Sequence, residues 1–355
     1  MPDGLSAEWL TTALKDCDLL TEQGVVTEVT ATQVGDGVGM MSELARLNLT
    51  YAGDDQAPAT LVAKFPSRNE TNRDVAMQYR IYEREVKFFQ ERAEHTAMCT
   101  PRMHIAEMQG DNFLLLMEDL SAYQEGDQVV GADLSQTEIA LDELAKLHAS
   151  HWGSVEDLVW VPGVADSYHA DNMANLSAVG WPVMCEVFAD VLPPEIAAAG
   201  EVFQGAVRKL QAAMCEAPKT LLHGDFRMEN FFFGELPGQH PMIVIDWQGP
   251  LLGNCMVDVA QMLCQSTQKD VRREHETELL QRYTRSLVEL GVEYDLERAR
   301  RDFNTAIFYH WAYTSVVAGT LDTSNPASYA WMAKMIERQS AASLDHNVFT
   351  ESEYV

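Results

Sequence analysis

The spacing of apolar residues changes about one third of the way along the chain. Before residue 120, apolar residues alternate with polar ones or form short runs next to glycine, which is the pattern of β-strands. After that point most of them recur three or four positions apart, which is the pattern of helices. This order predicts an α+β chain with two lobes, a β-rich one over residues 1–119 and a mostly helical one over residues 120–355.

The first lobe should contain three strands, a short helix, a long helix and a hairpin. The long helix is marked by Tyr79, Tyr82, Val86 and Phe89 on one face. The hairpin turns at Gly110-Asp111-Asn112, and its second strand is a continuous apolar run, which is typical of a central strand. We place the short helix at residues 5–20, the strands at 25–34, 43–51 and 60–65, and the hairpin at 103–120.

The second lobe shows helix signals interrupted by two short apolar runs. Ser135 and Glu138 form a capping-box pattern that predicts the start of a helix. The apolar runs at residues 219–226 and 241–247 flank a glycine-rich turn, so we expect a small hairpin there. Residues 303–321 carry no formal charge but include several polar side chains, which favours a buried helix over a membrane span.

The net charge of −29 limits the possible partners. Such a field repels nucleic acid and anionic membranes, so we expect neither as a partner. We interpret the charge chiefly as a solvated surface, although it would also attract a cationic substrate. The six cysteines are scattered, and the first residues do not resemble a signal peptide, so we expect a cytoplasmic protein. No pattern in the sequence indicates the oligomeric state.

The strongest chemical signal is His-Gly-Asp-Phe-Arg-Met-Glu-Asn, from His223 to Asn230, followed by Asp246 at the end of an apolar strand. Phosphoryl transfer requires a carboxylate near the attacking hydroxyl and oxygen ligands for Mg²⁺. Asp225 suits the first task, whereas the amide oxygen of Asn230 and the carboxylate of Asp246 suit the second. Any one of the three could be an ordinary turn residue. Their combined spacing favours a catalytic site.

Further segments accompany this motif along most of the chain. They are Glu8-Trp9-Leu10, the loop from Gly35 to Ser42, Arg46, Lys64, Glu85, Met117-Glu118-Asp119-Leu120, Leu147-His148-Ala149, Asp246-Trp247-Gln248 and Asp258. Together they resemble the aminoglycoside phosphotransferase and choline kinase superfamily, and most of all its ecdysteroid-kinase-like branch. The resemblance implies a bilobal protein-kinase-like fold with one long helix in its β-rich lobe. It also implies ATP as the phosphoryl donor and Mg²⁺ as the metal ion.

The resemblance assigns nucleotide binding to the first lobe. Lys64 would hold the α- and β-phosphates while paired with Glu85, although Glu83 is close enough in sequence to compete for it. An isolated lysine at a strand end would more often extend to solvent. Backbone N–H groups of the glycine loop would approach the phosphates, and the segment after the hairpin would hold the adenine. These further contacts are Gly35, Gly37, Gly39, Ser42, Met117 and the backbone of Glu118 and Leu120.

Four other residues could each have either a functional or a structural role. We expect His223 to brace the loop by hydrogen bonds and not to transfer protons. Arg227 could contact the transferred phosphoryl group or a substrate anion, or it could neutralise Glu229, and the sequence does not separate these roles. His148 and His151 could bind a metal, but without a third ligand we favour packing and capping.

Three functions follow from these residues. The leading hypothesis is a kinase for a hydroxyl group on a small molecule, with an apolar or ring-containing alcohol favoured by the aromatic residues at 150–200 and 300–335. An antibiotic kinase for aminoglycosides or macrolides is the alternative within this class, and a nucleotide-binding pseudokinase is the alternative outside it. Trp247 after the metal-binding aspartate, and the missing A-P-E motif, argue against a protein substrate. Asn254 occupies a position where many phosphotransferases have aspartate.

Overall fold

The structure, a computed structural model, describes residues 5–35, 41–54, 56–216 and 218–355. The chain divides into two compact units. Unit 1 contains residues 1–94 and 100–123, and unit 2 contains residues 95–99 and 124–355. The chain therefore passes from one unit to the other three times.

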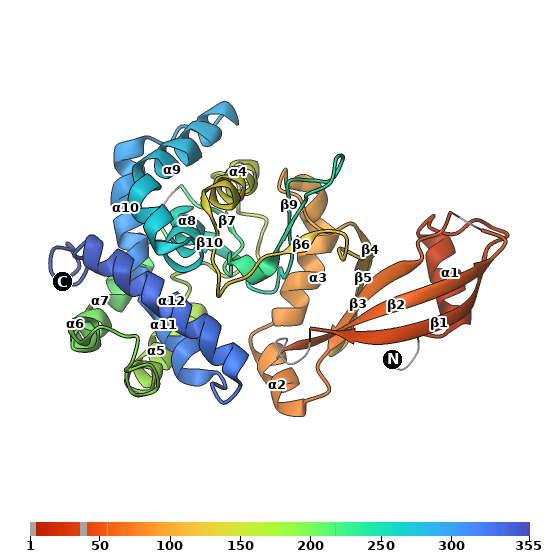
Figure 1. Ribbon diagram of the computed structural model, residues 1–355, viewed down its shortest axis with the longest axis horizontal. Coiled ribbons are helices and arrows are strands. Elements are labelled where there is room, and N and C mark those ends of the chain that lie inside the picture. Colours follow the sequence, from red (N-terminus) through yellow and green to blue (C-terminus); the bar gives the residue numbers. More distant parts are fainter. Residues whose placement is uncertain (1–4, 36–40, 55, 217) are drawn as a thin grey trace. The chain divides into compact units, whose positions relative to one another are not determined.

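Unit 1 is built on a five-stranded antiparallel sheet with the order β1-β2-β3-β5-β4 (Figure 1). In β2 the buried Leu47 and Leu49 alternate with polar residues, as the sequence pattern predicted. The hairpin of β4 and β5 is confirmed, and β5 lies between two neighbouring strands, which explains its continuous apolar run. The strands are β1 (Val25–Val34), β2 (Ser42–Ala52), β3 (Thr60–Pro66), β4 (Met103–Gln109) and β5 (Asn112–Glu118).

Three helices and a 3₁₀ turn belong to the first part of the chain. They are α1 (Ala7–Asp16), α2 (Glu70–Gln78), α3 (Ile81–Glu91) and η1 (Ala93–His95). The long helix expected from Tyr79 onward is α3, but it starts later, because Arg80 has a left-handed backbone with φ of 54°. Tyr79 is instead the C-terminal cap of α2. The buried face of α3 includes Tyr82, Glu85 and Val86.

Unit 2 is mostly helical, with two small antiparallel sheets of orders β10-β7 and β6-β8-β9. Its strands are β6 (Gln124–Glu125), β7 (Thr220–Leu222), β8 (Phe231–Phe233), β9 (Met242–Val244) and β10 (Leu251–Gly253). Its helices are α4 (Leu134–Ser150), α5 (Ser167–Val187), α6 (Pro194–Ala197), α7 (Gly200–Ala213), η2 (Met228–Asn230), α8 (Met256–Gln261), the π-helix η3 (Met262–Ser266), α9 (Lys269–Glu289), α10 (Leu296–Tyr309), α11 (Trp311–Thr320) and α12 (Pro326–Asp345).

Two local predictions for unit 2 need correction. The hairpin partner of β9 is β8, whereas β7 from the first apolar run pairs with β10. The capping box of α4 uses Asp133 and Gln136 in place of Ser135 and Glu138. Asp133 Oδ1 accepts a bond from the Gln136 backbone N–H at 2.8 Å, and Gln136 Oε1 accepts one from the Asp133 N–H at 3.2 Å. Aspartate is as good an N-cap residue as serine, so the helix begins after Asp133, the earlier of the two possible caps.

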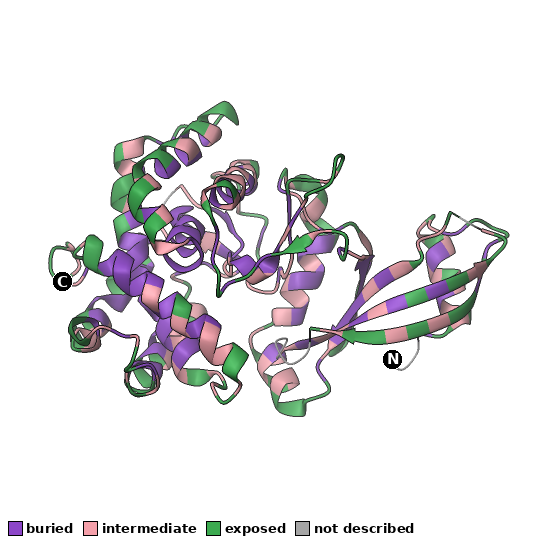
Figure 2. Cartoon of the chain, viewed as in Figure 1, coloured by how far each residue is buried: buried purple, intermediate pink, exposed green. Residues whose placement is uncertain are grey.

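Helices α5 and α11 cross closely in unit 2. A Cβ atom added at Gly180 would lie 2.2 Å from the carbonyl oxygen of Ser315, and one added at Gly319 would lie 2.2 Å from that of Gly180. The uncharged stretch at residues 303–321 runs through α10 and α11 and is mostly buried, as expected (Figure 2). Within the described ranges, every helix is too short or too polar to span a bilayer.

Candidate active site

The loop after β7 carries the HGD motif, and a buried carboxylate holds its backbone. Asp258 on α8 is fully buried, and its two oxygens accept hydrogen bonds from the backbone N–H groups of His223 at 2.7 Å and Gly224 at 3.0 Å. Burial acts to raise the pKa of Asp258, but its hydrogen bond from His148 and these contacts keep the pKa below the ordinary value. The ionised carboxylate therefore fixes the start of the loop.

Glycine is required at the second position of the motif. Gly224 has φ of 79°, and a Cβ atom there would lie 2.1 Å from the carbonyl oxygen of Gly249. Both features exclude larger residues without movement of the backbone.

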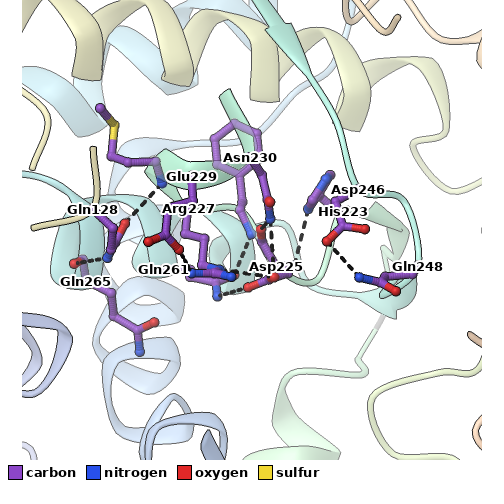
Figure 3. Close-up of polar contacts among 12 residues, drawn as sticks. Gln128, His223, Asp225, Arg227, Glu229, Asn230, Asp246, Gln248, Gln261 and Gln265 are labelled. Carbon is purple, nitrogen blue, oxygen red and sulfur yellow. Dashed lines mark hydrogen bonds and ion pairs between the residues drawn. The ribbon is translucent and has the colours of Figure 1, made fainter. Parts of the chain in front are cut away.

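The carboxylate of Asp225 is surrounded by four donors, of which Figure 3 shows the two from its own loop, Arg227 and Asn230. Its Oδ2 accepts bonds from Arg227 Nε and Asn230 Nδ2, each at 3.2 Å. Its Oδ1 accepts a bond from Tyr313 Oη at 2.6 Å and a longer one from Gln261 Nε2 at 3.4 Å. The structure thus brings three predicted residues together, and 22% of the Asp225 side chain remains exposed.

His223 links the backbone of Asp225 to that of Ile245, the residue before Asp246. The His223 Nδ1 accepts the Asp225 backbone N–H at 3.3 Å, and its Nε2 donates to the Ile245 carbonyl at 2.9 Å. This bonding matches the bracing role expected for His223. Asp246 has a left-handed backbone with φ of 66°, a strained conformation that is frequent at functional sites. Gln248 Nε2 donates to Asp246 Oδ2 at 2.7 Å.

Arg227 contacts both neighbouring carboxylates of its loop. It bonds Asp225, and its terminal nitrogen makes an ion pair with Glu229. Burial acts to lower the pKa of Arg227, but the charge of Asp225 raises it far above the ordinary range, so the guanidinium is always charged. The guanidinium also lies over the ring of Trp331, 4.6 Å from its centroid.

Two buried glutamines support the loop from outside. Gln128 Oε1 accepts the Met228 backbone N–H at 3.1 Å, while its Nε2 donates to the Gln265 carbonyl at 2.9 Å (Figure 3). Gln261 Oε1 accepts the Phe226 N–H at 2.8 Å. The backbone of the loop is thereby tied to α8 and to the π-helix η3, a helix type often found at functional sites.

The predicted ion pair in unit 1 is present. Lys64 Nζ lies 2.7 Å from Glu85 Oε1, and their side chains are only 7% and 2% exposed. The competing Glu83 instead pairs with Arg80 and Lys87. The helix register places Glu85 on the buried face of α3 and Glu83 nearer the solvent.

The other proposed nucleotide contacts are also in unit 1, and part of the glycine loop falls outside the described residues. Gly35 has a left-handed backbone with φ of 74°, and Ser42 is buried at the start of β2. Gly37 and Gly39 lie outside the described residues. On β5 and just after it, Met117 and Leu120 are buried, whereas Glu118 Oε1 accepts the Arg102 backbone N–H at 2.7 Å.

The two histidines of α4 lie in packing and capping positions. His148 is fully buried between Asp258 and Tyr283 Oη, and His151 is the C-terminal cap of α4. In the ranges that the structure describes, no three or more His, Cys, Asp or Glu side chains gather in a way that could hold a metal ion. Asn254 Nδ2 donates to Asp302 Oδ2 at 2.7 Å, and Asn254 Oδ1 accepts the Met256 N–H.

Sequence reasoning missed four side chains that contact the loop: Tyr313, Trp331, Gln261 and Gln128. Tyr313 belongs to the aromatic segments considered for substrate binding. Many other members of those segments are buried in the core, among them Trp160, Trp181, Phe308, Tyr309 and Trp311. The signal that could have found Gln261 is its position on the same helix as Asp258, three residues later.

Comparison with known proteins places the chain in a family. A model of the ecdysteroid kinase-like family matches residues 36–293, which is well over half of the chain. The chain belongs to the ecdysteroid kinase-like family. This confirms the branch that the sequence resembled. Among curated proteins, none matches the chain.

Solved structures of phosphotransferases share the fold of this family member at low sequence identity. The GDP complex of an aminoglycoside 2'-phosphotransferase of type IIIa matches with a TM-score of 0.54 and 14% identity, over 96% of this chain and 98% of that one. Choline kinase from Cryptosporidium parvum Iowa II matches with 0.52 and 9%, over 90% and 91%. Plasmodium vivax ethanolamine kinase matches with 0.51 and 10%, over 93% and 87%. The predicted α+β protein-kinase-like fold is confirmed.

Proposed function

We propose that the chain is a kinase that transfers the γ-phosphoryl group of Mg²⁺-ATP to a hydroxyl group of a small alcohol. The observation that carries the proposal is the orientation of the Asp225 carboxylate by four donors. A carboxylate that is held this firmly and is still partly exposed can orient an acceptor hydroxyl and receive its proton.

The residues beside Asp225 fit a hard metal ion. Asn230 uses its amide nitrogen for Asp225, so its amide oxygen is the atom suited to Mg²⁺, together with the Asp246 carboxylate. The Gln248 amide oxygen is buried and has no hydrogen-bond partner among the described residues, which adds an oxygen atom that a hydrated cation could satisfy. When bound, Mg²⁺ would neutralise charge on the phosphates.

Lys64 supplies the fixed positive charge that the triphosphate needs. Its pairing with the buried Glu85 holds the ammonium group in one position, so little ordering is needed when phosphates bind. Arg227 would add a permanent charge next to Asp225. Positioning and charge neutralisation would then account for most of the acceleration.

The acceptor that we favour is an apolar or ring-containing alcohol. Two aromatic side chains from different helices, Tyr313 on α11 and Trp331 on α12, contact Asp225 and Arg227. Aromatic surfaces bind apolar rings better than they bind highly hydroxylated sugars.

A direct test measures ADP formation with Mg²⁺-ATP and a panel of alcohols that includes sterol-like, aromatic and aminoglycoside members. We expect at least one apolar alcohol to stimulate ADP formation and to gain the mass of one phosphoryl group. Asp225→Asn should lower kcat/KM by about 100-fold or more, since general bases contribute at least that much.

A matched control is Asp270→Asn, which makes the same chemical change at an exposed position in the first turn of α9. It should retain wild-type activity. If Asp225→Asn were as active as Asp270→Asn with every reactive alcohol, Asp225 would not be the base. ATP binding without turnover on any alcohol would support the pseudokinase alternative, and turnover on aminoglycosides alone would support the antibiotic kinase.

A further inference from the structure

The shortest contact of the Asp225 side chain comes from far away in the sequence. Tyr313 Oη lies 2.6 Å from Asp225 Oδ1, although 88 residues separate the two. The other donors to the carboxylate are longer, at 3.2 Å for Arg227 and Asn230 and 3.4 Å for Gln261. Short O–H···O⁻ bonds are the stronger ones, so Tyr313 dominates the hydrogen bonding of Oδ1.

The Tyr313 hydroxyl remains a donor under all ordinary conditions. Burial raises its pKa well above 10, and the negative charge of Asp225 raises it further. A phenol that stays protonated is neutral, so it can orient a carboxylate without adding a charge at the place where the substrate binds.

The backbone around Tyr313 holds the hydroxyl in place. Tyr313 is the third residue of α11, the helix whose close crossing with α5 depends on Gly180 and Gly319. The ring also contacts His310 edge to face, with 6.4 Å between the centroids. The hydroxyl is therefore placed by rigid elements outside the catalytic loop.

We infer that Tyr313 is a positioning residue for the proposed reaction: by donating to Oδ1 from α11, it sets the orientation of the Asp225 carboxylate toward the acceptor hydroxyl. The inference rests on the proposed function. Arg227 and Asn230 lie in the same loop as Asp225, whereas Tyr313 on α11 and, at a longer distance, Gln261 on α8 hold the carboxylate from other helices. The 22% exposure of Asp225 leaves room for an acceptor while Tyr313 stays bound.

The test compares Tyr313→Phe with Tyr329→Phe. Phenylalanine keeps the ring and removes only the hydroxyl. Tyr329 offers a matched control, because its hydroxyl donates to Asp190 at 2.7 Å, away from the loop. Tyr313→Phe should lower kcat by roughly 10- to 100-fold, the range for one hydrogen bond to a charged group. The KM values for ATP and alcohol should stay within about twofold, and Tyr329→Phe should leave both constants unchanged.

Two kinetic outcomes would overturn the inference. An unchanged kcat in Tyr313→Phe would mean that the other donors are sufficient to orient the Asp225 carboxylate. A lower KM for the alcohol with the same kcat would mean that Tyr313 competes with the acceptor for Asp225. A melting temperature close to that of wild type verifies that the variant is folded.

A second readout does not depend on activity. The hydroxyl proton of a phenol in a short bond to a carboxylate should give a downfield, slowly exchanging NMR signal. We expect this signal in the wild type and in Tyr329→Phe, and its loss in both Tyr313→Phe and Asp225→Ala. If no alcohol is phosphorylated by the wild type, the proposed function fails, and this signal alone decides whether Tyr313 orients Asp225. A signal that persists in Asp225→Ala overturns the inference.

Discussion

Lys64 and Glu85 form an ion pair whose energetics differ from those of the surface pairs in this chain. Both side chains are almost completely buried. Taking two charges out of water costs several kcal/mol per ion, and their attraction repays this only in part. Such a pair adds little to stability compared with apolar residues of similar size. We interpret its presence as a requirement of nucleotide binding.

This interpretation predicts different outcomes for single and double substitutions. Lys64→Met leaves a buried carboxylate without its ammonium partner and should reduce the free energy of unfolding by about 3–5 kcal/mol. Replacing both residues, Lys64→Met with Glu85→Leu, should recover most of that loss. Nucleotide binding should stay weak in both proteins. Denaturant titration and calorimetric titration with ATP measure the two quantities.

The surface pair of Arg80 and Glu83 on the same part of the chain provides the control. Arg80→Met should change stability by less than about 1 kcal/mol, because exposed ion pairs contribute little. If the double variant bound ATP like the wild type, Lys64 would have no role at the phosphates.

The residues of the candidate site divide into those that the sequence could reveal and those that it could not. Asp225 and Asn230 lie within six positions of each other and Asp246 follows at short spacing, so the sequence alone predicted a common site for these three. Tyr313 and Gln128 contact the same loop from 88 and 100 residues away. Such contacts depend on helix packing, and a single sequence carries no signal of which distant side chains meet.

At the scale of elements, the crossing of α5 and α11 determines where Tyr313 lies. Gly180 and Gly319 bring the two backbones together, with no space for a methyl group at either position. Small residues at a crossing allow helices to approach closely, and any larger side chain must push them apart.

Gly180→Ala should therefore destabilise unit 2 by about 1–3 kcal/mol, the usual cost of overpacking. Gly205→Ala is a control in the interior of α7, where an added Cβ atom has no neighbour within 4 Å. That substitution should stabilise the protein by up to about 1 kcal/mol, because alanine favours helices. Thermal unfolding measures both effects. Equal stabilisation by the two substitutions would show that the crossing can relax.

Element prediction succeeded where periodicity was long and failed where elements were short. Strands β1 to β3 have at least seven residues each, and their bounds were predicted from the sequence within about two residues. Strands β7 to β10 have three residues each, too few for a pattern to specify a pairing partner, so the hairpin was assigned wrongly. The break at Arg80 was also missed, because arginine rarely adopts a left-handed backbone.

At the scale of the whole molecule, a buried histidine should make stability depend on pH. Burial lowers the pKa of His310 from 6.5 to about 4, partly offset by its hydrogen bond to the Val257 carbonyl. Because the pKa is lower in the folded state, the unfolded chain binds more protons between these values. The stabilisation from neutral His310 is thus complete above pH 6.5 and is lost as the pH falls toward 4.

Between pH 7 and pH 5, the wild type should lose about 2 kcal/mol more stability than His310→Gln. Glutamine keeps an N–H donor for the Val257 carbonyl and does not ionise in this range. Urea denaturation of both proteins at the two pH values measures this difference in the free energy of unfolding. The contributions of the other titrating groups are the same in both proteins and cancel. An equal loss in both would mean that His310 becomes protonated in the folded protein without penalty.

The path of the chain between the two units determines how either unit could be expressed by itself. Residues 95–99 belong to unit 2 but are encoded between two segments of unit 1. Within unit 2, Cys99 accepts a bond from the Val244 N–H and donates its own N–H to Glu143. A gene truncated to start at residue 124 would lose this short piece and expose the edge of β9 and one side of α4. Isolating the helical half calls for a circularly permuted gene or a grafted peptide, because no single cut yields both halves intact.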